Sequence, residues 1–219
     1  MTPPSSSNTT INEPPNEIDD AEPSMNASRP MRVFVGVRIA SAIASELTRL
    51  ARDLEQFPVR LVAMGDVHLT LVPPWNESSI LEATEKIGSV AGGFCGFTLG
   101  FRHLGYGPNP ERPRLLWAEC DATSELTALR AALLQACGKT GERAFRPHVT
   151  VARLRESGRM IAMRCPIDRE ISFTQQVDSI ELFRSPPSGG VGYQILASLP
   201  LGAGPASRNS PTNGFAVQT

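Results

Sequence analysis

Apolar side chains follow two different periods along the chain, and together these periods predict an α+β domain. Several short stretches place apolar residues at alternate positions or in brief runs, which is typical of strands. Longer stretches repeat apolar residues every three or four positions, as one face of a helix requires. We predict strands at 31–40, 59–64, 67–73, 95–104 and 114–120, at 148–154, and near 170–184 and 192–199, with helices at 41–56, 77–91 and 123–137.

Local signals set the expected boundaries of these elements. Ser41 is a suitable N-cap for the first helix, because its hydroxyl can accept a hydrogen bond from a free N–H of the first turn. The pair Pro73-Pro74 is expected to end the strand before it. Long crossover connections mix with hairpin-like ones, so we expect largely antiparallel sheets.

The two ends of the chain have a different composition from its middle. Residues 1–30 and 202–219 are rich in small, polar and proline residues and carry few large apolar side chains. Such segments bury too little surface to offset the entropy of ordering, so we expect two disordered tails around one folded domain at 31–201. Met31 opens the first apolar stretch and is an alternative start of the protein.

Charge is distributed unevenly between tails and body. The formal net charge of the chain is −1, but residues 31–201 hold 19 basic and 17 acidic residues, a net of +2. A mildly basic body suits a small anionic ligand better than a long duplex. Nearly all of the basic residues are arginines, which either reflects genome composition or favours bidentate phosphate contacts.

Cysteine usage and hydropathy indicate the compartment. The four cysteines form no CxxC pair and match no zinc spacing, so we expect reduced, mostly buried thiols. We see neither an apolar run of membrane-span length nor a signal peptide, and we expect a cytoplasmic protein with no membrane partner.

Two of the three histidines stand in matching tetrapeptides, HLTL at 68–71 and HVTV at 148–151. Side chains alternate along a strand, so His68 and Thr70 share one face while the aliphatic residues between and after them face the core. The same holds for His148 and Thr150. Each strand is therefore expected to present one imidazole and one hydroxyl to an open space.

Paired imidazoles in one small space indicate general acid–base chemistry, because histidine titrates near neutral pH. One ring accepts a proton from water, the other donates a proton to a leaving oxygen, and the threonine hydroxyls hold phosphate oxygens. This chemistry needs no metal ion or cofactor. A two-histidine metal site is the competing interpretation, but the pattern lacks a nearby carboxylate or third histidine.

These motifs resemble those of the 2H phosphoesterases, and within them the RNA 2',3'-cyclic phosphodiesterases, or 2'-5' RNA ligase-like proteins. The similarity extends over most of 31–201. Besides the two HxTx motifs, it rests on the blocks MRVFVGV, VRLVAMGDVHLTL, RPRLLWAEC, FRPHVTVARLR and SIELFRSPPSGGVGYQILASLPL, which occur in the same order.

The resemblance implies a two-lobed α+β fold, with two largely antiparallel sheets and outer helices facing across a central cleft. It implies that His68 is the proton donor to the departing ribose oxygen and His148 the proton acceptor that activates water. Thr70 and Thr150 would bind the phosphate. The implied reaction opens a 2',3'-cyclic phosphate to a 2'-phosphate, and some family members weakly catalyse the reverse joining reaction.

Other candidate residues have more than one interpretation each. The resemblance implies that Arg153 reaches the phosphate, although regular alternation would turn it toward the core. Arg146 either shapes the start of its strand, lies at the cleft rim or contacts the phosphate. Phe34 and Tyr193 either belong to the core or stack on a base. His103 is expected to be structural or exposed.

The chain departs from the family pattern after the first motif, where VPPWNES replaces the usual Lys-Phe-Leu-Gly. Trp75 in this segment either contacts substrate or covers the lobe. Substrate choice therefore stays open between RNA 3' ends, mononucleotides and another small cyclic phosphate such as an ADP-ribose cyclic phosphate. A nucleotide- or RNA-binding module without turnover is the non-enzymatic alternative, although both histidines and both threonines are present. We expect a monomer, since two internal halves already build the cleft.

Overall fold

A computed structural model of the chain describes residues 29–202, apart from 142–143, 156–157 and 187–191. The tails expected at 1–30 and 202–219 lie almost wholly outside the described residues, as does most of the expected turn at 185–190. Within the described part, no helix is both long enough and apolar enough to cross a membrane.

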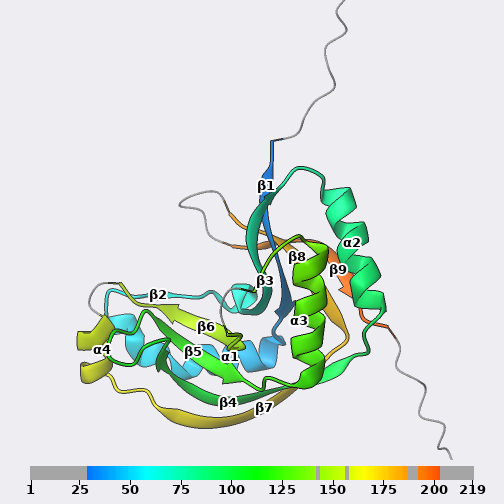
Figure 1. Cartoon of the computed structure of the whole chain (residues 1–219). Helices are drawn as coiled ribbons and strands as arrows, with labels where there is room; N and C mark the ends of the chain where they lie inside the picture. Colours follow the sequence, from blue (N-terminus) through cyan, green and yellow to red (C-terminus); the bar gives the residue numbers. More distant parts are fainter. Residues whose placement is uncertain (1–28, 142–143, 156–157, 187–191, 203–219) are drawn as a thin grey trace, which may run out of the picture.

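The strands of the described residues form one nine-stranded sheet in the order β7-β4-β5-β6-β3-β1-β8-β9, with β2 paired to β6 (Figure 1). Every strand pairing is antiparallel. The strands are β1 (Met31–Arg38), β2 (Arg60–Leu61), β3 (His68–Glu77), β4 (Phe97–Gly107), β5 (Leu115–Cys120), β6 (His148–Arg153), β7 (Arg169–Val177), β8 (Ser179–Arg184) and β9 (Gln194–Pro200). The expected α+β class is confirmed.

Four α-helices and two 3-10 helices are described. Their bounds are α1 (Ser41–Leu50), α2 (Ile80–Gly92), α3 (Ser124–Ala136), α4 (Gly158–Arg164), η1 (Arg52–Gln56) and η2 (Met64–Asp66). The side chain of Ser79 caps α2 by accepting from Glu82 N at 3.3 Å, and Thr123 caps α3 by accepting from Leu126 N at 3.2 Å. Helix α2 packs on β9 and against α3, which in turn packs on β3.

The sheet consists of two lobes joined at one point. The first lobe holds β1, β3, β8 and β9, and the second holds β2, β4, β5, β6 and β7. Strands β3 and β6 join the lobes through a single residue pair, Leu69 with Val149. Both side chains are buried, so apolar contact supports the joint where the ladder is shortest.

Several expected boundaries were wrong. The strand at 67–73 does not stop at Pro73-Pro74 but runs to Glu77, because the register between β1 and β3 shifts there and bulges tolerate residues without an N–H. The helix at 41–56 ends at Leu50 and continues as η1. Helix α2 begins at Ile80 rather than 77 because Ser79 caps it, and α4 was not predicted at all.

The cysteines are free thiols, as expected, but they are less buried than expected. Cys120 is buried, Cys137 and Cys165 are half-buried, and Cys95 is exposed. Burial raises the pKa of the Cys120 thiol to about 12, so this side chain behaves as a small apolar core residue.

The joint between the lobes makes a stability prediction. Leu69→Ala should lower the free energy of unfolding by about 2–5 kcal/mol, because truncation leaves a cavity at a fully packed position. Urea denaturation would measure it, with Leu81→Ala, at 71% exposed, as the matched control that changes stability by less than about 0.5 kcal/mol. Equal effects of the two substitutions would contradict the role of the joint.

Candidate active site

The two HxTx motifs meet at the joint between the lobes. His68 begins β3 and His148 begins β6. In both strands the expected alternation holds: the histidine and threonine are half-buried, and the aliphatic residues after each of them are buried. Because Leu69 pairs with Val149 in antiparallel sense, His68 lies across from Thr150 and Thr70 across from His148. The structure therefore brings together all four residues that the motifs predict.

Both imidazole rings are held in the same way. The Nδ1 of His68 lies 2.7 Å from the backbone oxygen of Asp66, and the Nδ1 of His148 lies 2.8 Å from that of Arg146. A carbonyl oxygen only accepts hydrogen bonds, so each Nδ1 must carry the proton and donate it. The neutral ring then has a free lone pair on Nε2, and Nε2 is the atom available for proton transfer in both halves.

Aromatic rings surround His68. Its ring centroid lies 4.7 Å from that of Phe34, 5.6 Å from that of Phe183 and 5.0 Å from that of Tyr193. Phe34 is only 2% exposed and stacks on Phe183, so the interpretation that it stacks on a substrate base was wrong. The Tyr193 ring stands nearly perpendicular to the rings of His68 and Phe34, and thus packs on the candidate histidine itself.

Asp66 links this aromatic group to the histidine, a role that the sequence analysis missed. Its carbonyl oxygen accepts from His68, and its side-chain Oδ1 accepts from the backbone N–H of Tyr193 at 2.8 Å. The short helix η2 ends at Asp66, so one turn of chain positions both groups. The only sequence signal was an Asp two residues before the histidine, which is also common in turns.

His148 has a different neighbour, Trp117 on β5. Their ring centroids are 4.4 Å apart, and the Arg146 guanidinium lies over the indole at 5.2 Å. Arg146 also donates to Glu119 Oε1 at 3.0 Å. The backbone of Arg146 therefore fixes the orientation of the His148 ring. Its guanidinium pairs with Glu119 and lies at the rim, as one of the interpretations expected.

Both candidate histidines favour the neutral form in the free protein. Burial lowers the pKa of His68, and the positive charges of Arg153 and His148 lower it further, against the opposing effect of the Asp66 hydrogen bond. Burial likewise lowers the pKa of His148. The hydrogen bond to the Arg146 backbone opposes this effect, the positive charges of Arg146 and Arg153 add to it, and the charge of Glu119 opposes it. An anion placed between the rings would raise both pKa values again.

The positive charge of Arg153 lowers the pKa of both His68 and His148. Regular alternation along β6 would turn it toward the core, but the register with β5 shifts between Leu116 and Trp117. Val151 and Ala152 are consequently both buried, and Arg153 is returned to the exposed face of His148. This bulge depends on the pairing of β6 with β5, so the pattern along β6 alone could not reveal it.

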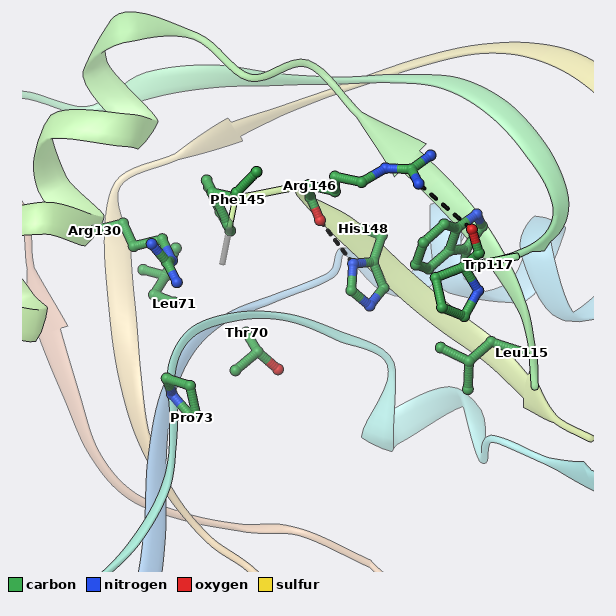
Figure 2. A pocket seen from close by; sticks show the side chains of 11 residues that line it. Thr70, Leu71, Pro73, Leu115, Trp117, Arg130, Phe145, Arg146 and His148 are labelled. Atoms are coloured by element: carbon green, nitrogen blue, oxygen red, sulfur yellow. Dashed lines mark hydrogen bonds between the residues drawn. The ribbon is translucent and has the colours of Figure 1, made fainter. Parts of the chain in front are cut away.

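A cavity of about 400 Å³ opens beside His148 (Figure 2). Thr70 and His148 line it together, so it is continuous with the space between the motifs. Its walls are mostly apolar and carry two cationic side chains, Arg130 and Arg146. The apolar residues are Leu71, Pro73, Pro108, Leu115, Trp117, Ala144 and Phe145. Arg130 lies over the Phe145 ring at 4.4 Å from its centroid.

Two remaining candidates lie elsewhere. Trp75 donates from Nε1 to Glu77 at 2.9 Å and lines a separate hollow with Ala83, Lys86 and Cys137 of the helical layer, so it covers the first lobe. His103 on β4 pairs with Asp168, which agrees with the expected structural role. Across the described ranges, no three His, Cys, Asp or Glu side chains are grouped as metal ligands.

Comparisons with known proteins find a matching family model and two named relatives. The family model of the 2'-5' RNA ligase superfamily matches residues 65–186. An RNA 2',3'-cyclic phosphodiesterase of Archaeoglobus fulgidus is 27% identical over 138 residues, which cover 60% of this chain and 77% of the relative. A protein of the same name from Aquifex aeolicus is 25% identical over 138 residues, covering 59% of this chain and 73% of the relative.

Solved structures share the fold. TT0787 of Thermus thermophilus superposes with a TM-score of 0.61 at 23% identity, covering 79% of this chain and 99% of that one. LigT of E. coli complexed with ATP gives a TM-score of 0.59 at 23% identity, with the same coverage of 79% and 99%. At 23% identity, these similarities show a shared fold alone.

The hydrogen bonds at Nδ1 and the position of Arg153 predict a distinctive NMR titration. Both His68 and His148 should show the Nδ1–H tautomer and pKa values below the ordinary 6.5 or so. Arg153→Gln should raise both values, because it removes a nearby positive charge, whereas Arg49→Gln on α1 should change neither. Nitrogen-15 spectra across the titration would measure this, and an Nε2–H tautomer at either ring would contradict the assignment.

Proposed function

The chain belongs to the 2'-5' RNA ligase superfamily and is a hydrolase of the phosphodiesterase type, and we propose that it opens 2',3'-cyclic phosphates to 2'-phosphates with His68 and His148 as acid and base. The substrates would be RNA 3' ends or nucleotides. The observation that carries the proposal is the pair of identically held rings, each with Nε2 free beside the threonine of the opposite motif.

The reaction follows from this arrangement. His148 Nε2 accepts a proton from a water molecule, whose oxygen attacks the phosphorus. The bond from phosphorus to the ribose 3' oxygen breaks, and His68 Nε2–H gives its proton to that oxygen. The product carries a 2'-phosphate and a 3'-hydroxyl, and proton exchange with solvent then restores both rings. The donor and acceptor assignments come from the family resemblance, because the two rings are held alike.

Substrate charge supplies the protonation state that this reaction needs. One ring must be cationic, yet burial and Arg153 keep the pKa of both below the ordinary value. A cyclic phosphate monoanion between the rings would favour a proton on one of them. The enzyme would thus acquire its acid together with its substrate.

The remaining polar groups would hold the phosphate. Thr70 and Thr150 come from opposite strands and offer one hydroxyl each, and Arg153 offers a guanidinium that can bind two oxygens at once. All three would act on charge that increases at the oxygens as water attacks. The nucleoside would occupy the cavity beside His148, whose volume of about 400 Å³ is in the usual range for small ligands.

Substitution of either histidine tests the mechanism. His68→Ala and His148→Ala should each reduce kcat by about 10²–10⁴-fold, because a positioned acid or base is worth that much. The assay would use EDTA, 2',3'-cyclic AMP and a short RNA ending in a 2',3'-cyclic phosphate, and would identify the product as a 2'- or 3'-phosphate.

His103→Ala is the matched control and should keep the wild-type rate, since His103 lies on β4 and pairs with Asp168, outside both HxTx motifs. Wild-type rates in both HxTx variants would contradict the acid–base assignment. Folded protein that cleaves neither substrate would direct attention to another small cyclic phosphate.

The lowered pKa values also predict the pH profile. The ratio kcat/KM depends on the free enzyme with one ring charged and the other neutral, a form that is most abundant between the two pKa values. Because both lie below the ordinary 6.5 or so, the optimum of kcat/KM should fall on the acid side of about pH 6.5. Arg153→Gln should move it upward, and an optimum well above pH 7 in the wild type would contradict this account.

A further inference from the structure

Four arginines gather around a hollow at the end of the second lobe, outside the site described above. The hollow has a volume of about 530 Å³ and is lined by Arg112, Pro113, Arg114, Leu154, Arg155, Gly158 and Arg159. All four arginines are exposed, whereas Pro113, Leu154 and Gly158 are buried and form its floor. Figure 1 shows α4, which carries Arg159, at this end of the lobe.

The floor of the hollow is well defined. The backbone N–H of Leu154 donates to the carbonyl of Arg114 at 2.8 Å, which ties the chain after β6 to the chain before β5. Gly158 lies so close to Pro113 that an added Cβ would be 2.0 Å from the Pro113 oxygen. The four guanidinium groups therefore stand on a packed base formed by two segments of the chain, one before β5 and one from the end of β6 to the start of α4.

Two strands connect this hollow to the catalytic cleft. Arg153 pairs with Leu115, which lines the cavity beside His148, and the residues just beyond this pair, Leu154 and Arg114, line the hollow. Arg155 is two residues beyond Arg153, or roughly 7 Å along an extended chain. Arg153 and the arginines of the hollow thus lie on the same two segments of the chain.

Charge in the hollow favours a polyanion. Every charged side chain among its described lining residues is an arginine, and no described acidic residue pairs with these four. Glu111 lines an adjoining hollow with Arg159, and Glu156 lies outside the described residues. Guanidinium groups bind phosphate oxygens in a bidentate way, and four of them exceed what one terminal phosphate needs.

We propose that this arginine hollow binds the phosphodiester backbone of an RNA strand just upstream of the cyclic phosphate in the cleft. The inference rests on the proposed function and narrows it, because a mononucleotide has no upstream phosphate to place there. The preferred substrate is then the 3' end of an RNA chain. Contact with phosphates alone would make this preference independent of base sequence.

Charge-neutral variants test the proposal. Arg112→Gln with Arg114→Gln, and Arg155→Gln with Arg159→Gln, are compared with the wild type on 2',3'-cyclic AMP and on an RNA octamer ending in a 2',3'-cyclic phosphate. We expect kcat/KM for the octamer to fall roughly tenfold per pair, and its salt dependence to weaken by a slope of about 0.7 for each phosphate that the variant no longer neutralises. The value for cyclic AMP should stay unchanged.

Arg32→Gln with Arg184→Gln is the matched control. It removes the same charge from β1 and β8, and Arg32 stands at the opposite end of β1 from Arg38, which pairs with His68. Equal losses on both substrates, or an equal loss in the control pair, would overturn the proposal.

Binding measured without turnover separates this inference from the proposed function. Fluorescence anisotropy of a labelled RNA octamer ending in a 2'-phosphate should show tighter binding to the wild type than to either arginine pair. Weakened binding in these variants would support the hollow even if neither cyclic phosphate were hydrolysed, which would count against the proposed function alone. Unchanged octamer binding in both variants would overturn the hollow while leaving the cleft chemistry intact.

Discussion

Each HxTx histidine donates from Nδ1 to a backbone oxygen two residues earlier in the chain, and the chemistry of the site depends on this hydrogen bond. The bond fixes the tautomer and the direction of the ring, so that Nε2 is left for proton transfer. Its partners are main-chain atoms, which are held by η2 before His68 and by the segment before β6 at His148. Because the same hydrogen bond is made in both halves, the two strands present their imidazole rings in the same way. Their different surroundings, an aromatic group at His68 and Trp117 with Arg146 at His148, are what distinguishes the two rings.

The joint between the lobes turns these two local arrangements into one site. A single pair, Leu69 with Val149, connects β3 to β6, and the histidines and threonines of the two motifs flank it on the opposite face. The core beneath this pair thus sets the separation of the histidines. The register shift in the β5–β6 pairing adds Arg153 to this arrangement, because it returns the Arg153 side chain to the face of His148. The chain segments just beyond these two strands line the arginine hollow, so one strand pair would organise both the proposed phosphate site and the proposed path of the RNA.

Sequence reasoning predicted the parts of this structure that depend on period and composition. Alternation placed both histidines and both threonines on one face, and the strand and helix patterns gave the α+β class. It failed where a long-range pairing overrides the local pattern. The bulge that redirects Arg153 and the register shift that lets β3 run through Pro73-Pro74 are properties of two strands together. Phe34 looked available to a base, but its burial against Phe183 follows from the packing of β1 on β8. The roles of Asp66 and Trp117 depend in the same way on contacts between segments distant in sequence.

A crystal structure of the protein with bound 2'-AMP would test the central claim, that the two Nε2 atoms act on one phosphate. The account predicts the phosphate between the motifs, with both Nε2 atoms within about 2.7–3.2 Å of oxygens on or next to the phosphorus, on opposite sides of it. Thr70, Thr150 and Arg153 would contact the remaining oxygens. A phosphate bound away from either histidine, or a ring turned so that Nδ1 faces the ligand, would contradict the account.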